Sequence, residues 1–182
     1  MVRLEIHPVA PRPALSLRAP SHISGSTCYI IQSEKGRRKL VSMKQTFNLD
    51  RFIEAQNDVF SEVIAELSAG SKRSHWIWFI FPQMKGLGHS PQAQSYGIGS
   101  LAEAVAYWQH PVLSQRLQQC TQLVLDVEGR TINQILGSPD DLKFRSSMTL
   151  FARAAADTPI FKQALEKYFS SEPDPLTLDL LH

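Results

Sequence analysis

The sequence has little cysteine and no long apolar run, and each shortage excludes a class of protein. Its two cysteines, Cys28 and Cys120, provide neither the ligand spacing of a zinc site nor a disulfide framework. That usage is typical of a reducing compartment, so we predict a cytoplasmic protein. No apolar run approaches the roughly 18 residues of a membrane span. A membrane partner is therefore not expected.

Pairs of metal-binding or acidic side chains are missing too. No two of the six histidines are three or four residues apart, which removes the usual histidine pair of a helical metal site. No pair of acidic residues lies near the most aromatic segment, so a carboxylate dyad is not expected there. The sequence predicts no metal ion and no other cofactor.

Basic residues are in excess only near the beginning of the chain. The net charge is +2, but residues 1–42 carry seven Lys and Arg against two Glu, and the rest carries twelve against fifteen Asp and Glu. Because nucleic-acid binding depends on neutralising phosphates, the mildly acidic body argues against a nucleic-acid partner.

The first 43 residues differ in composition from the rest. They contain Pro8, Pro11, Pro13 and Pro20, scattered arginines and no apolar periodicity. Such a stretch buries too little surface to offset the entropy of ordering. We predict that residues 1–43 are either a flexible, disordered extension or the product of a mis-assigned start. Residues 44–182 are predicted to form a single domain, a normal length for one core.

From residue 44 onward, apolar residues recur at helical spacing. One continuous helix is expected from a cap at Asn48 or Asp50 to Gly70. Further helix starts are marked by capping residues or prolines at Ser90-Pro91, Ser100, Pro111, Thr131, Ser138-Pro139, Pro159 and Asp174-Pro175. Without hairpin signals, the pattern predicts an all-α fold, a single compact globule of about six to eight short helices with orthogonal packing.

Ser74 to Ser90, SHWIWFIFPQMKGLGHS, is the most unusual segment. Its seven residues from His75 to Phe81 include two tryptophans, two phenylalanines and two isoleucines, and Pro82 ends the run. A loop with two glycines follows. No second strand-like run exists to pair with this segment, so we interpret it as helical and buried.

Within this segment, three kinds of candidate residue occur. His75 is a candidate general acid or base, because the pKa of histidine lies near neutrality, although a histidine here can equally be a core or rim residue. Trp76 and Trp78 can stack on a planar ligand, or simply fill the core. The loop residues that can present N–H groups or charge to an anion are Gln83, Lys85, Gly86 and Gly88.

A second polar cluster lies in the segment DDLKFRSSMTLF. Lys143 and Ser147 are four residues apart and share a helix face, and Asp140 and Lys143 are spaced to pair. Serine and threonine are poor helix formers, so Ser-Ser-Met-Thr inside a helix indicates ligand binding or close helix packing. Lys143, Ser146 and Ser147 are therefore candidate ligand-binding residues.

The order of the motifs SHWIWFIFPQ, GLG, HPVL-x-x-RL, DDLKFRSSMTLF and DPLTLDLL resembles an uncharacterised all-helical bacterial family of unknown function. Automatic annotation often labels its members "calpastatin". The resemblance extends from about Phe47 to Leu181. It implies a compact all-α fold and no particular activity. The label does not suit the chain, because a calpain inhibitor is a disordered polar repeat chain.

Three functions fit these residues. The first is a domain that binds a small-molecule or nucleotide-like ligand where His75, Trp76, Gln83 and Lys143 converge on one cavity. The second is a hydrolase acting on a nucleotide or ADP-ribose-type substrate, which requires His75 or an acid in that cavity. The third is a protein-interaction module with a protein partner, in which the aromatic segment forms an exposed apolar patch.

Overall fold

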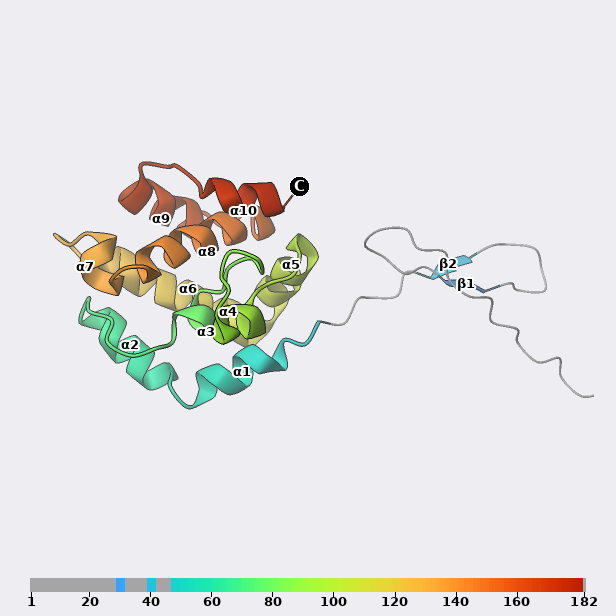
Figure 1. Ribbon diagram of the computed structural model, residues 1–182, viewed down its shortest axis with the longest axis horizontal. Coiled ribbons are helices and arrows are strands. Elements are labelled where there is room, and N and C mark those ends of the chain that lie inside the picture. Colours follow the sequence, from blue (N-terminus) through green and yellow to red (C-terminus); the bar gives the residue numbers. More distant parts are fainter. Residues whose placement is uncertain (1–28, 32–38, 42–46, 182) are drawn as a thin grey trace, which may run out of the picture. The chain divides into compact units, whose positions relative to one another are not determined.

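A computed structural model describes residues 29–31, 39–41 and 47–181, which belong to two separate units divided after Thr46 (Figure 1). In the first unit, β1 (Tyr29–Ile31) pairs antiparallel with β2 (Lys39–Val41), and Tyr29 lies opposite Val41. The rest of residues 1–43 lies outside the described residues. Disorder or a mis-assigned start in that stretch stays a prediction.

The second unit is helical, and the all-α fold predicted for the body is confirmed. Its described residues form ten helices, α1 (Asp50–Asn57), α2 (Phe60–Ser68), α3 (Ile77–Ile80), α4 (Pro91–Tyr96), α5 (Leu101–Gln109), α6 (Pro111–Asp126), α7 (Ile132–Leu136), α8 (Asp140–Ala154), α9 (Ile160–Phe169) and α10 (Pro175–Leu180). The number exceeds the expected six to eight because several helices are only one or two turns long. None of the helices in the described ranges has the length and apolarity to cross a membrane.

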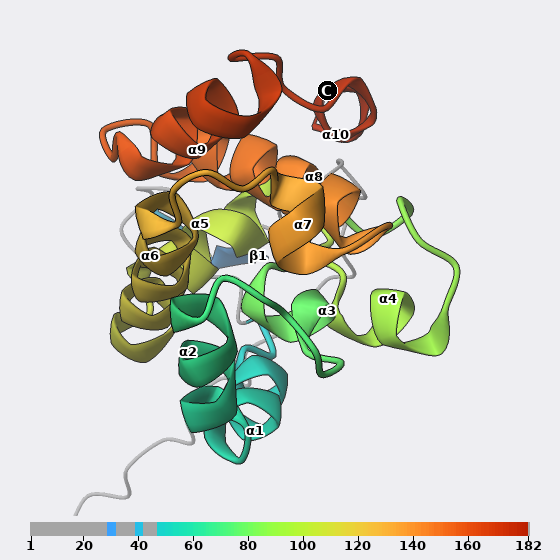
Figure 2. The same cartoon turned by 90° about the vertical axis from the view of Figure 1, so that its left-hand side faces the viewer.

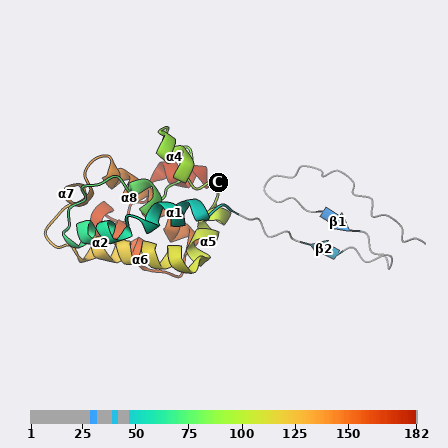
Figure 3. The ribbon, with the colours of Figure 1, turned by 90° about the horizontal axis from the view of Figure 1, so that it is seen from below.

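The continuous helix expected up to Gly70 is instead two helices, so that prediction was wrong. The chain turns at Asp58 and Val59, between α1 and α2. Asn, Asp and Val are all poor helix formers. Packing favours the break as well, because α1 lies against α3. In contrast, α2 lies along α6, as Figure 3 shows.

Most of the predicted helix starts are correct. The side chains of Ser90, Ser100, Thr131 and Asp174 each accept a hydrogen bond from a backbone N–H in the first turn of their helix. His110 caps α6 in the same way through Nδ1, which explains the histidine before Pro111 as a structural residue.

Two predicted caps are absent. The residue before α1 is Leu49, so neither Asn48 nor Asp50 caps that helix. Ser138 does not cap α8, which starts at Asp140 without a side-chain cap. The two acidic residues of its first turn take over this role, since carboxylates are favourable at the positive end of a helix dipole.

The core of the second unit is built around α8. This helix packs against α5 and α9 along much of its length, and α3, α7 and α10 also contact it (Figure 2). The ring of Phe144 packs edge-to-face on that of Phe81, with the ring centres 4.9 Å apart. The ring centre of Phe151 lies 5.2 Å from that of Tyr107 and 5.7 Å from that of Phe161. One face of α8 therefore contributes aromatic rings to the core.

The aromatic segment belongs to this core, as expected from its composition. It forms the single helical turn of α3, and Trp76, Ile77, Ile80 and Phe81 are each at most 1% exposed. It therefore does not form the exposed apolar patch that the protein-interaction hypothesis requires. That expectation was wrong, because most of the six consecutive apolar residues from Trp76 to Phe81 fill the core of the second unit rather than its surface.

Candidate functional site

A cavity of about 510 Å³ lies where three parts of the second unit meet. Its walls are formed by the segment from α3 to the start of α4, the first half of α8 and the beginning of α10. The residues that line it are Trp78, Gln83, Leu87, Gly88, His89, Ser90, Ala93, Pro139, Leu142, Lys143, Arg145, Ser146, Asp174 and Leu176. Its volume lies within the roughly 300–1,000 Å³ that is usual for sites of small molecules.

Five of the candidate residues from the sequence meet in this cavity. They are Trp78, Gln83, Gly88, Lys143 and Ser146. The two segments that contain them are more than fifty residues apart in the sequence. Of the four residues that the ligand-binding hypothesis expected to converge, Gln83 and Lys143 line the cavity, whereas His75 and Trp76 do not.

The other candidates lie elsewhere. His75 is exposed and outside the cavity lining, and Lys85 and Gly86 are exposed in the loop beside it. Trp76 is buried in the core, where its indole N–H donates to Glu66 at 2.8 Å. Ser147 is fully buried. The structure therefore does not bring these residues together with the cavity.

Glu66 fixes the conformation of the chain that leads into α3. Its buried carboxylate accepts from the backbone N–H groups of Arg73 and Ser74, both at 2.9 Å, and from the indole N–H of Trp76. Burial raises the pKa of Glu66, but these hydrogen bonds outweigh burial and hold the pKa below its ordinary value. The carboxylate thus stays charged and anchors one wall of the site.

Lys143 is the best-defined cation of the cavity. Its ammonium lies 4.7 Å from the ring centre of Trp78 and 2.7 Å from Oδ1 of Asp140. The other oxygen of Asp140 binds Lys72, which is nearly buried, at 2.7 Å. Because an ammonium group has three protons and Asp140 accepts only one, Lys143 has donors left for a ligand.

Asp140 shares its single charge between these two lysines. Burial raises the pKa of Asp140, but the hydrogen bonds and charges of Lys143 and Lys72 outweigh burial and lower the pKa below its ordinary value. The three side chains together carry a net charge of +1. The cavity wall beside Trp78 is consequently positive.

Asp174 provides an acceptor in the lining of the same cavity. Its Oδ2 accepts from the hydroxyl of Ser146 at 2.9 Å and from both the N–H and the hydroxyl of Thr177, at 3.1 and 2.5 Å. These bonds join α8 to the start of α10. They also fix the orientation of the carboxylate.

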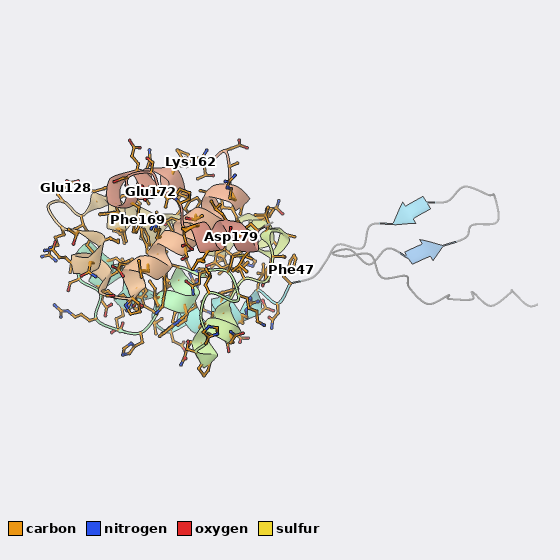
Figure 4. The ribbon with its side chains drawn as sticks, turned by 45° about the horizontal axis from the view of Figure 1, so that its top comes forward. Phe47, Glu128, Lys162, Phe169, Glu172 and Asp179 are labelled. Atoms are coloured by element: carbon orange, nitrogen blue, oxygen red, sulfur yellow. The ribbon has the colours of Figure 1, made fainter. Side chains whose placement is uncertain are left out.

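The chain before Asp174 is held by α8 as well. The Arg145 guanidinium donates to the carbonyl groups of Glu172 and Pro173 and lies over the ring of Phe169 (Figure 4 labels Glu172 and Phe169). Thr149 accepts from the N–H of Asp174 at 2.8 Å. Two of the polar residues inside α8 that looked unfavourable in the sequence, Ser146 and Thr149, therefore serve to dock this segment.

Two exposed leucines give part of the cavity lining an apolar character. Leu142 is 58% exposed and Leu176 is 61% exposed, and both line the cavity opening. Large exposed leucines that gather at one opening are more informative than scattered ones. They provide a surface for an apolar portion of a ligand.

Sequence reasoning missed several residues of this site. His89 was not among the candidate residues, but it is exposed and lines the cavity. Asp174 was identified only as the start of a helix. A signal for its second role was present in the Ser-Ser-Met-Thr run, because poor helix formers inside a helix indicate ligand binding or close packing with another segment.

Other features of the described residues are weaker candidates. A hollow of about 500 Å³ on α6 is lined by four glutamines and Leu123, with no charged group. No group of three or more His, Cys, Asp or Glu within the described ranges is arranged to hold a metal ion. The cavity beside α8 is therefore the site with the richest chemistry.

Comparisons with known proteins agree with the fold. The model of a family described as "Protein of unknown function (DUF1810)" matches residues 46–181. The crystal structure of the conserved hypothetical protein Rv1873 from Mycobacterium tuberculosis is similar, with 54% identity and a TM-score of 0.73. The match covers 74% of this chain and 96% of that one. No curated protein matches the chain.

Proposed function

The chain belongs to the DUF1810 family, whose description assigns no activity, and we propose from the geometry of the cavity that it binds a small organic anion with a flat or apolar portion. One observation carries the proposal: the ammonium of Lys143 lies over the face of Trp78 at the wall of the cavity. A nucleotide has both properties, and so does an aromatic carboxylate. The proposed setting remains the cytoplasm, where such metabolites occur.

Charge and burial support this assignment. Lys143 is partly buried, with 21% of its side chain exposed, so its charge is less screened than that of a surface lysine. Asp140 holds the ammonium in place but is shared with Lys72. An anion at Lys143 therefore meets a positioned donor, while Trp78 and the two exposed leucines of the cavity contact the rest of the ligand.

The test is a thermal-shift and calorimetric screen of the full chain against nucleotides, sugar phosphates and aromatic carboxylates. A compound at 100 times its Kd stabilises the folded state by about 2.7 kcal/mol, which raises Tm by several degrees. For any compound that binds the wild type, we expect Lys143→Met to lower the affinity at least tenfold. Methionine retains much of the apolar contact with Trp78 but removes the charge.

Lys85→Met is the matched control. Lys85 lies in the loop between α3 and α4, other residues of which line the cavity. Its own side chain is exposed and does not line the cavity. We expect this variant to bind as the wild type does. Equal losses of affinity in the two variants would indicate a diffuse charge effect. If no compound of the panel binds the wild type, the proposal is contradicted.

A hydrolase with a nucleotide-type substrate is a second candidate, favoured by one observation. An acid, Asp174, and an imidazole, His89, line the cavity that Lys143 makes suitable for anions. A carboxylate or an imidazole can activate a water molecule as a general base. Incubating each bound phosphate compound with the wild type and following the products by ³¹P NMR tests this candidate, and unchanged compounds would contradict it.

A further inference from the structure

The two carboxylate oxygens of Asp174 are used very differently. Oδ2 accepts three hydrogen bonds, one from Ser146 and two from Thr177. Oδ1 accepts none from the described residues, although Asp174 lines the cavity and is only partly exposed. A carboxylate can accept about four hydrogen bonds, so the free capacity of this side chain lies on Oδ1.

This free oxygen belongs to a rigid support. The N–H of Asp174 donates to Thr149, and Arg145 holds the two residues before it. The side chain itself is fixed from two directions by α8 and by the first turn of α10. Because the surroundings already fix the orientation of this acceptor, little side-chain entropy is lost when a ligand binds it.

The group that binds Oδ1 is identified by the charges around it. A carboxylate repels anions and attracts donors, so the bound group has an N–H or O–H. Lys143 and Arg145 line the same cavity and disfavour a second cation. A neutral donor, the hydroxyl group, fits both conditions.

The anion and the hydroxyl lie close together on such a ligand. Lys143 and Ser146, which donates to Asp174, are three residues apart on α8, so their Cβ atoms are about 5–6 Å apart. One small molecule therefore reaches both. A hydroxyl within a few bonds of the carboxylate or phosphate satisfies this spacing.

We propose that Asp174 accepts a hydrogen bond from a ligand hydroxyl, and that the ligands of this site are hydroxylated organic anions. Hydroxy acids, sugar phosphates and nucleotides share this chemistry. The inference rests on the proposed function, because Lys143 must bind the anionic group. Asp174 then determines which anions bind.

Asp174→Asn is the decisive variant. Asparagine caps a helix about as well as aspartate, and its carbonyl oxygen can accept the bonds from Ser146 and Thr177. Its NH₂ group then occupies the position of Oδ1 and donates instead of accepting. The fold is retained while the proposed interaction is reversed, which circular dichroism and Tm verify.

Two matched probe pairs separate the sources of the anion. Mandelate and phenylacetate differ only in a hydroxyl beside the carboxylate, and adenosine monophosphate and its 2′,3′-dideoxy form differ only in the ribose hydroxyls. Calorimetry with the full chain is expected to show that the hydroxylated member of at least one pair binds roughly tenfold tighter, as for a hydrogen bond to a charged group. Asp174→Asn is expected to abolish this difference, and the deoxygenated member is expected to bind the variant at least as tightly as the wild type, because a carboxylate that repels anions has been removed.

The outcomes distinguish the two proposals. If both members of a pair bind equally, lose affinity in Lys143→Met and are not weakened by Asp174→Asn, the proposed function stands and the hydroxyl inference is wrong. If none of the four probes binds the wild type at millimolar concentration, or if Lys143→Met has no effect, both are overturned. Selective loss of the hydroxylated member in Asp174→Asn supports both.

Discussion

Ser146 and Ser147 are neighbours on α8 with opposite surroundings. The hydroxyl of Ser146 donates to the carboxylate of Asp174. The hydroxyl of Ser147 is fully buried and has no hydrogen-bond partner among the described residues. A buried hydroxyl without a partner is destabilising, whereas one that binds a carboxylate contributes to stability. The sequence treats the two as equivalent, and the fold does not.

Replacing each serine by alanine is expected to affect stability differently. Ser147→Ala should leave the free energy of unfolding unchanged or raise it by up to about 1 kcal/mol, because it removes an unpaired hydroxyl and improves helix propensity. Ser146→Ala should lower it by about 1 kcal/mol, because Asp174 loses a donor. Urea unfolding measures both. A clear loss in Ser147→Ala would mean that its hydroxyl has a role that the packing does not reveal.

Trp76 and Trp78 show the limit of sequence reasoning at the same scale. Both were predicted to face either a ligand or the core, and hydrophobicity alone does not separate them. Two residues apart on a helical turn, side chains point in directions about 200° apart. Trp76 therefore enters the core beside Glu66, while Trp78 reaches the cavity.

The elements themselves were largely predictable, because their starts have local signals. Ser90, Ser100, Thr131 and Asp174 cap helices as expected from side-chain chemistry that operates within one turn. The break after α1 was missed because the apolar period continues through it. The cavity was only partly predictable, since it depends on how α8 and α10 pack, and no local pattern records that contact.

The connection between α2 and α3 depends on one side chain, Glu66. We expect Glu66→Ala to lower the free energy of unfolding by about 3 kcal/mol, because it leaves two backbone N–H groups and a buried indole N–H without their acceptor. Denaturant unfolding checks this value. Glu62→Ala is the control, an exposed acid one turn earlier on α2. A loss of equal size in both variants would mean that helix electrostatics, and not the connection, determines the effect.

At the scale of the whole molecule, titratable groups whose pKa values are shifted in the folded state make stability depend on pH. At high pH one such group is Cys120, because burial raises the pKa of its thiol to about 12, and burial raises the pKa of the Tyr107 hydroxyl as well. In the unfolded chain a thiol titrates near pH 8.5. The stability due to the neutral thiol is thus complete below about pH 8.5 and decreases as the pH rises toward 12.

At low pH the relevant groups are Glu66 and Asp140, whose folded-state pKa values are below their ordinary values. An unfolded glutamate titrates at about pH 4.3 and an aspartate at about 3.9, so the unfolded chain takes up protons first on acidification. A depressed pKa contributes stability that is complete above the unfolded value and is lost as the pH falls through the folded value. The contribution of these two carboxylates to stability should therefore be constant above about pH 5 and decline below about pH 4.

Glu66→Gln isolates the share of one carboxylate in this decline. The amide oxygen still accepts hydrogen bonds but cannot titrate, so the variant should be less stable at pH 7 and should lose less additional stability between pH 5 and pH 3. Free energies of unfolding in urea, measured at half-unit steps for the wild type and the variant, give the two slopes. Because other acids titrate identically in both proteins, the difference in slope reports Glu66 alone. Parallel curves would show that this carboxylate is not preferentially charged in the folded state, and its hydrogen bonds would then not be what holds the loop before α3.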